Sequence, residues 1–176
     1  DQPMHTQLLG RHNIYNILAA VAVAVELGME LPVIARAVAA VPPVPHRLVS
    51  QAAAKFSIID DAFNSNPVGS KMALEVLAAM PGGKKIVITP GMVELGAEEY
   101  EKNKAFAMNC AETCDYVILV GKKHSQPLQD GLKAANLPVD RYYIADSFQD
   151  AYQHMLGMVQ QGDYVLIEND LPDTYL

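Results

Sequence analysis

The sequence has little cysteine, no tryptophan and fewer basic than acidic residues. Two cysteines among 176 residues are too few for a disulfide framework or a multi-cysteine metal site, so a reducing compartment, the cytoplasm, is expected. With 13 Lys+Arg against 20 Asp+Glu the formal net charge is −7, which disfavours nucleic acid and anionic membranes as partners. The apolar runs fall far short of the ~20 residues of a membrane span, and the first residues do not resemble a signal peptide.

The residues that are present favour a globular protein with two unequal parts. The composition is 51% hydrophobic and 19% charged, enough to bury a core. Apolar spacing predicts a helix over residues 13–28, apolar on nearly all faces and therefore expected to be buried on several sides, and a second helix over 32–40. Three prolines then form a hinge at residues 42–45. We expect residues 1–44 to be the helical remnant of a neighbouring domain, and the chain to be part of a longer protein.

Residues 45–176 predict a second domain of a different kind. Continuous apolar runs alternate with amphipathic segments, which is typical of a parallel sheet covered by helices on both faces. The prediction is a three-layer, Rossmann-like α/β domain with a mostly parallel sheet of about six strands. The expected strands are 48–53, 56–59, 86–88, 116–120, 142–144 and 164–167, and the expected helices are 67–80, 97–113, 126–135 and 148–159.

Acidic and amide side chains follow the second expected strand. In parallel sheets ligands bind at the carboxyl ends of the strands, and Asp60 and Asp61 end such a strand. Paired carboxylates there can bind a metal, accept a proton or hold a ribose. Asn64 and Asn66 follow, and these residue types are equally suited to a turn and a helix cap. No GxGxxG or GxxxxGK[ST] loop follows any expected strand, so this domain has no phosphate cradle of its own.

Three other places carry polar groups with a possible binding role. Glu94 lies in a loop between two glycines, which permits close approach to a ligand, although a plain connection would have the same composition. His46 and Arg47 follow the hinge, where Arg can clamp a phosphate and His can stack on a base, or both can be solvated. Asn13 and Asn16 share one side of the first helical turn, where amides can recognise an adenine edge, or Asn13 can cap the helix.

Four motifs occur together in one order along the chain. They are Gly10-Arg11-His12-Asn13-x-x-Asn16, Pro45-His46-Arg47, Asp60-Asp61-x-x-Asn64-x-Asn66-Pro67 and Gly91-Met92-x-Glu94-Leu95-Gly96. In this order and spacing the chain resembles the carboxy-terminal part of the Mur ligase family, the ATP-dependent amide-bond ligases of bacterial cell-wall synthesis. The third motif is most similar to members that add D-alanyl-D-alanine to a UDP-muramoyl-tripeptide.

The resemblance implies an ATP site between a central and a carboxy-terminal domain. Arg47 is then the residue expected to act on the phosphates during catalysis. The phosphate loop, the Mg²⁺ ligands and the UDP-binding domain are expected upstream of Asp1. The residues implied to bind ATP are Asn13, Asn16, His46, Arg47 and Asp61, with Asp61 on the ribose, and those implied to face the amino substrate are Asp60, Asn64, Asn66 and Glu94.

The implied reaction begins when a carboxylate attacks the γ-phosphate of ATP, giving an acyl phosphate and ADP. The acceptor amine then attacks the acyl phosphate, forming the amide and releasing phosphate. On this hypothesis the 176 residues alone are inactive, and the partners are a UDP-muramoyl-peptide, an amino acid or dipeptide, and the missing domains. Other Mur-like ligases remain alternatives, of the folylpolyglutamate or cyanophycin type or as an amidotransferase subunit. A receiver-like signalling domain and a stand-alone nucleotide-binding module are the non-catalytic alternatives.

Overall fold

The computed structural model describes residues 1–169. The expected domain boundary at 176 therefore lies outside the described residues. The strands are β1 (Val49–Ala52), β2 (Phe56–Asp61), β3 (Lys85–Thr89), β4 (Tyr116–Val120), β5 (Tyr142–Ala145) and β6 (Asp163–Glu168). The helices are α1 (Arg11–Glu26), α2 (Leu31–Ala40), α3 (Pro67–Ala79), η1 (Gly96–Glu98), α4 (Glu99–Thr113), α5 (Gln126–Ala134), η2 (Val139–Arg141) and α6 (Phe148–Met158).

The sheet confirms the predicted α/β class. Its strand order is β1-β2-β6-β3-β4-β5, and every neighbouring pair is parallel except the antiparallel edge pair β1 and β2. The last strand, β6, is inserted between β2 and β3, with Glu168 in register with Asp61. The carboxyl end of β6 is therefore flanked by the loops that follow β2 and β3.

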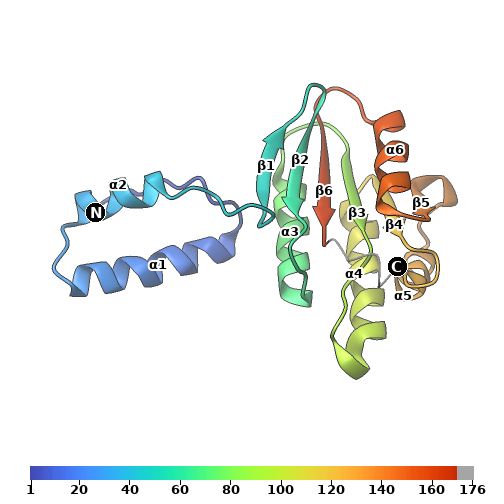
Figure 1. Ribbon diagram of the computed structural model, residues 1–176, viewed down its shortest axis with the longest axis horizontal. Helices are drawn as coiled ribbons and strands as arrows, with labels where there is room; N and C mark the ends of the chain where they lie inside the picture. Colours follow the sequence, from blue (N-terminus) through green and yellow to red (C-terminus); the bar gives the residue numbers. More distant parts are fainter. Residues whose placement is uncertain (170–176) are drawn as a thin grey trace.

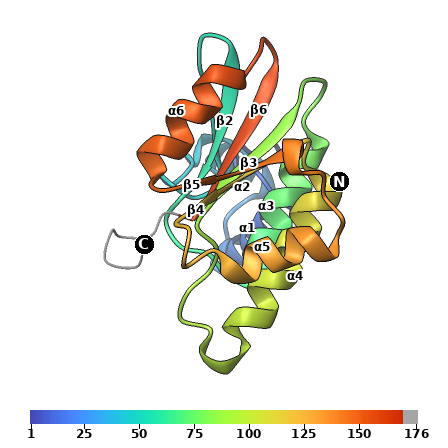
Figure 2. The ribbon, with the colours of Figure 1, turned by 90° about the vertical axis from the view of Figure 1, so that its right-hand side faces the viewer.

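Helices cover the two faces of the sheet unequally (Figures 1 and 2). On one face lie α3, α4 and α5, whose Leu77, Phe106 and Leu128 are buried in one cluster with strand residues. On the other face α6 contributes Met155 to a second cluster. Both sides of the central strands are therefore apolar, as the continuous runs predicted. Each helix across residues 1–169 is too short or too polar to span a bilayer.

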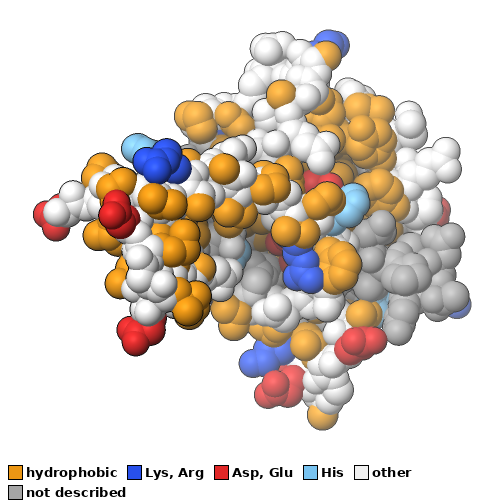
Figure 3. All heavy atoms as spheres, turned by 60° about the vertical axis from the view of Figure 1, so that its left-hand side comes forward, with side chains coloured by type: hydrophobic (Ala, Val, Ile, Leu, Met, Phe, Trp, Pro, Cys, Tyr) orange, Lys and Arg blue, Asp and Glu red, His pale blue; other side chains and the backbone are white. Residues whose placement is uncertain are grey.

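The helical segment α1–α2 stands apart from the sheet domain (Figure 1). The expectation that α1 is buried on several sides is wrong for the described residues: it has no buried residue, and Ile14, Leu18 and Val25 are exposed. The physical reason is that α2 is its main packing partner. Hydrophobic side chains consequently gather on the surface of this segment (Figure 3).

The turn before β3 contains a glycine that no other residue can replace without a clash. Gly83 has φ +56°, and a Cβ there would lie 1.9 Å from the carbonyl oxygen of Gly162. Neighbouring Gly82 has a similar φ of +63° but open space around it. Substitutions at these two glycines therefore distinguish the free-energy cost of a left-handed backbone from that of a steric clash with Gly162.

Gly83→Ala is therefore expected to destabilise the chain by about 3 kcal/mol or more, because strain and overpacking add. Gly82→Ala, the matched control, is expected to cost about 1 kcal/mol, from strain alone. Urea unfolding of the two variants checks the difference, and equal losses of stability would contradict it.

Candidate functional site

A cleft of about 380 Å³ lies between the helical segment and the carboxyl edge of the sheet. Figure 3 shows the hollow between the apolar surface of the helices and the rest of the molecule. Its walls come from the start of α1, from the hinge, and from the loops around β2. The structure brings together six of the residues predicted from sequence: Asn13, Asn16, Arg47, Asp61, Asn64 and Asn66 all line the cleft.

The α1 wall presents two linked amides. Asn13 Nδ2 donates to the Leu9 carbonyl oxygen at 2.7 Å, and Asn16 Nδ2 donates to Asn13 Oδ1 at 3.1 Å. The alternative that Asn13 caps the helix is wrong, because α1 begins earlier and Gly10 is the N-cap. His12 also lines the cleft, a residue to which the sequence analysis gave no role although its motif contains it.

Arg47 is held in the cleft wall by a loop of unusual backbone conformation. The residues on either side, His46 and Leu48, have φ of 59° and 53°, in the sparsely populated left-handed region. Leu48 is 4% exposed, and its N–H donates to Asp61 Oδ1 at 3.0 Å. The Arg47 guanidinium carbon lies 4.1 Å from the centre of the Phe63 ring. Among the described residues, Arg47 is the one Arg or Lys of the lining.

Asp61 is the acidic group of the cleft. Burial raises the pKa of Asp61 above its ordinary value, and the Leu48 N–H and the nearby charges of His12 and Arg47 act in the opposite direction. Asp61 lines the cleft, and a carboxylate that accepts one backbone N–H retains acceptor capacity for the hydroxyls of a ligand.

Asp60 and His46 pair with each other and are not part of the cleft lining. His46 Nδ1 lies 2.9 Å from Asp60 Oδ2, and Asp60 Oδ1 accepts the N–H of Ala62 at 3.3 Å. The His46 side chain is 61% exposed. Both residues lie one position from a lining residue, so they border the cleft rather than forming its wall.

Asn64 and Asn66 fit both alternatives predicted from sequence, the turn or helix cap and the place in a binding site. Asn66 caps α3, its Oδ1 accepting from the N–H groups of Val68 and Gly69 at 3.1 and 2.9 Å, and Asn64 Oδ1 accepts the N–H of Ser65 at 2.8 Å. Both residues nevertheless line the cleft. The cap thus fixes the start of α3 at the cleft wall.

Glu94 lies in a separate, clamped loop. It is exposed, has φ 64° and is not among the cleft-lining residues. The preceding Met92 is fully buried and is held on both sides by Asn103 of α4, whose Oδ1 accepts the Met92 N–H and whose Nδ2 donates to the Met92 carbonyl, each at 2.8 Å. Asn103 is thus a positioning residue that sequence reasoning missed, because nothing in a helical pattern marks a loop clamp.

Asn103→Ala is expected to destabilise the chain by about 3 kcal/mol, because it leaves the buried N–H and C=O of Met92 without partners. Asn109→Ala, on the same helix and half-buried, is the control and is expected to cost under about 1 kcal/mol. Thermal or urea unfolding of both variants measures this, and equal stabilities would count against the clamp.

The family of the chain follows from its similarity to known protein families. The profile of the Mur ligase, glutamate ligase domain matches residues 46–168, which is more than half of the chain. The chain belongs to the Mur ligase family. The UDP-N-acetylmuramoyl-tripeptide–D-alanyl-D-alanine ligase of Escherichia coli is 41% identical over 122 residues, 66% of this chain. The UDP-N-acetylmuramoyl-L-alanyl-D-glutamate–2,6-diaminopimelate ligase of Geobacillus kaustophilus is 27% identical over an alignment of 178 positions that covers 98% of this chain.

Solved structures support the Mur ligase fold. The crystal structure of MurF ligase from Thermotoga maritima in complex with ADP matches with a TM-score of 0.76 and 21% identity, over 92% of this chain and 35% of that one. This Mur ligase chain spans 26% of the length of the Escherichia coli ligase and 36% of that from Geobacillus kaustophilus.

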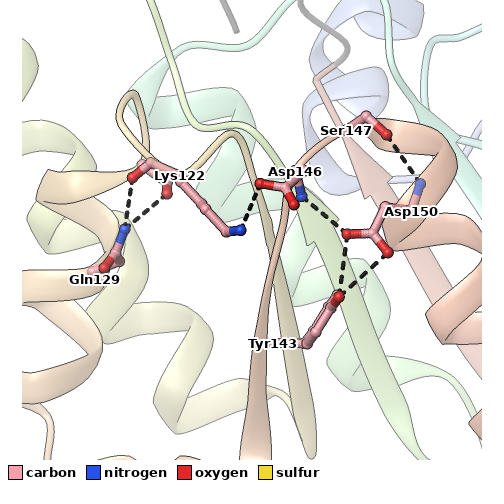
Figure 4. Close-up of polar contacts among 7 residues, drawn as sticks. Lys122, Gln129, Tyr143, Asp146, Ser147 and Asp150 are labelled. Atoms are coloured by element: carbon pink, nitrogen blue, oxygen red, sulfur yellow. Dashed lines mark hydrogen bonds and ion pairs between the residues drawn. The ribbon is translucent and has the colours of Figure 1, made fainter.

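A second polar cluster in this Mur ligase domain lies beyond β4 and β5 (Figure 4). Lys122 Nζ lies 2.7 Å from Asp146 Oδ1, a contact that raises the pKa of Lys122. Asp150 Oδ2 accepts the Asp146 N–H at 3.0 Å, and Tyr143 also donates to Asp150. The receiver-like alternative is not supported, because the family match covers residues 46–168 of the chain.

From sequence, a metal site was one of the alternatives for Asp60 and Asp61, whereas the resemblance implied that the Mg²⁺ ligands lie outside these residues. Within residues 1–169 no three His, Cys, Asp or Glu side chains gather as a metal site would require. Cys110 and Cys114 are buried free thiols, and burial raises the pKa of Cys110 well above its ordinary value. They are core residues.

Proposed function

We propose that the chain is the carboxy-terminal part of an ATP-dependent amide-bond ligase that binds ATP in the 380 Å³ cleft and uses D-alanyl-D-alanine as acceptor. The observation that carries this proposal is the convergence of Asn13, Asn16, Arg47 and Asp61 on one cleft. The most distant of these residues, in α1 and at the end of β2, are separated along the chain by α2 and β1. Each has a chemistry that suits one part of a nucleotide.

The chemistry of the lining fits ATP. Amides on the α1 wall offer both donors and acceptors to an adenine edge, and Asp61 offers acceptors to ribose hydroxyls. The Arg47 guanidinium provides a fixed positive charge for phosphate oxygens. Bound ATP supplies the phosphoryl group that activates a carboxylate; Arg47 stabilises negative charge, and the remaining residues orient the ligand. His46 borders the cleft where a base would enter.

The acceptor side is assigned to the loops after β2 and β3. Asn64 and Asn66 present amides at the cleft, Asp60 borders them, and Glu94 extends from its clamped loop as an exposed carboxylate. An ammonium-bearing dipeptide needs acceptors for its amine and donors for its carboxylate, and this set has both. The 41% identity to a ligase named for D-alanyl-D-alanine favours that dipeptide, and its name points to a UDP-muramoyl-tripeptide as the second substrate.

The remaining machinery is proposed to lie in other domains of the same protein. The 176 residues contain no GxxxxGK[ST] loop, so the β- and γ-phosphates and Mg²⁺ are proposed to be held by the central domain, to which residues 1–44 would belong. The 176 residues alone are expected to show no acceptor-dependent ATP hydrolysis. Such hydrolysis by this chain would contradict the proposal.

The experiment is a ligation assay with the protein as its gene encodes it. ATP, UDP-muramoyl-tripeptide and D-alanyl-D-alanine are supplied, and the amide product is detected by mass spectrometry. Formation of the UDP-muramoyl-pentapeptide supports the assignment. The parallel arm supplies diaminopimelate and UDP-muramoyl-dipeptide, because the Geobacillus ligase matches 98% of this chain. Product in the diaminopimelate arm alone would show that diaminopimelate, and not D-alanyl-D-alanine, is the acceptor. Product in neither arm would contradict the proposed ligase function.

A further inference from the structure

A buried carboxyl group joins the two acceptor-side loops. Glu168 ends β6 and is 1% exposed. Its Oε1 accepts the hydroxyl hydrogen of Ser65, which lies between Asn64 and Asn66, and its Oε2 accepts the hydroxyl hydrogen of Thr89 at 3.3 Å. One side chain thus contacts the loop after β2 and the end of β3.

The contact continues into the loop that carries Glu94. The Thr89 hydroxyl oxygen accepts the N–H of Gly91 at 3.0 Å. Asn169, the residue that follows β6, donates from Nδ2 to the Gly91 carbonyl oxygen. The backbone N–H of Asn169 donates to the Asp61 carbonyl oxygen at 3.1 Å. The end of β6 is therefore bonded to both flanking loops, which follows from its insertion between β2 and β3.

If the side chain at position 168 only filled space, an apolar residue would be more favourable for the free energy of folding. A buried carboxyl is costly unless its hydrogen bonds are satisfied, and the other residues of β6 that face the core are Val165 and Leu166. The two oxygens of Glu168 bond to hydroxyls of two different segments, the loop after β2 and the end of β3. A bonded polar group of this kind fixes relative positions more strictly than apolar contacts do.

We propose that Glu168 is a positioning residue that holds the Asn64–Asn66 loop and the Gly91–Glu94 loop in register for the acceptor. Glu168 touches neither substrate and acts through Ser65 and Thr89. The inference rests on the proposed function, because it assumes that these loops bind the acceptor. The coupling between the loops is a property of the fold and is measured separately.

The coupling is tested by hydrogen exchange in the protein as its gene encodes it. Ser65→Ala is expected to speed amide exchange not only around residue 65 but also at residues 91–94, by about tenfold or more. Thr89→Val is likewise expected to speed exchange not only at residues 91–94 but also around residue 65. Ser125→Ala removes another buried hydroxyl, which accepts from Gln129 at 3.1 Å, and is expected to change neither loop. Exchange that rises only beside each substitution overturns the coupling.

The positioning role is tested by kinetics of the same variants. Ser65→Ala and Thr89→Val are each expected to raise the KM for D-alanyl-D-alanine by about tenfold, with the KM for ATP changed less than about threefold. Thr89→Ser is expected to restore the wild-type value. Equal shifts in both KM values, or an unchanged acceptor KM, overturn the role. A wild-type protein that ligates no acceptor refutes the proposed function instead, and the exchange experiment still decides the coupling.

Discussion

Arg47→Ala is expected to lower kcat/KM for ligation by about 100- to 1,000-fold, because a fixed charge aimed at a phosphoryl group is lost from a cleft wall that has no other Lys or Arg within the described residues. The guanidinium is pre-positioned. It lies over Phe63, and its backbone is anchored by the buried Leu48 and the bond from Leu48 N–H to Asp61. The effect is expected mainly in kcat, since positioned charge acts most strongly on the transition state.

Two variants distinguish this role from a general loss of charge. Arg47→Lys keeps the charge without the planar fork and is expected to fall between wild type and Arg47→Ala. Arg36→Ala removes an exposed arginine of α2 and is expected to change kcat/KM less than about threefold. Steady-state ligation kinetics measure all three, and an Arg47→Ala enzyme as active as Arg36→Ala would contradict the assignment.

The stability of the chain is expected to depend on pH through Glu168. Burial raises the pKa of Glu168 from 4.5 to about 8, with the charge of Asp61 acting in the same direction and the Ser65 and Thr89 hydroxyls opposing it. Between these pH values the folded chain keeps a proton that the unfolded chain has released. Glu168 therefore contributes full stability below pH 4.5, which is lost as pH rises toward about 8.

Glu168→Gln cannot ionise, so its stability relative to wild type is expected to increase from pH 5 to pH 8, by up to about 5 kcal/mol at full amplitude. Glu112→Gln, at an exposed position of α4, is the control and is expected to follow the wild-type pH dependence. Urea unfolding of the 176-residue chain at several pH values measures the differences. A constant difference between Glu168→Gln and wild type would contradict the buried, protonated state.

Much of the fold was predictable because burial on both faces leaves a simple trace in the sequence. The runs at 86–88, 116–120 and 164–167 lie inside β3, β4 and β6. The central place of β6 was not predictable, because strand order depends on which helices pack on which face. The apolar pattern of α1 correctly predicted a helix, but the burial inferred from it is not found in the described residues. A sequence pattern does not show whether a packing partner is present.

The candidate site was predictable in its residue types and only partly in its geometry. Motif order gave Arg47 and Asp61, which line the cleft, whereas Glu94 and Asp60 do not. Local backbone decides this: the left-handed conformation of Glu94 and the His46–Asp60 pair cannot be read from spacing. Glu168 could have been predicted as a site residue, since it is an acidic residue at the carboxyl end of an apolar strand. The predicted strand ended at residue 167, one position before it.

The proposed function requires that ATP binds between α1 and the loops around β2. Photoaffinity labelling with an azido-ATP, applied to the protein as its gene encodes it and followed by peptide mass spectrometry, tests this directly. Labelled peptides are expected to include residues 12–16 or 46–47, and unlabelled ATP is expected to suppress the labelling. Labelling confined to the Lys122–Asp146 edge, with none in those peptides, would contradict it.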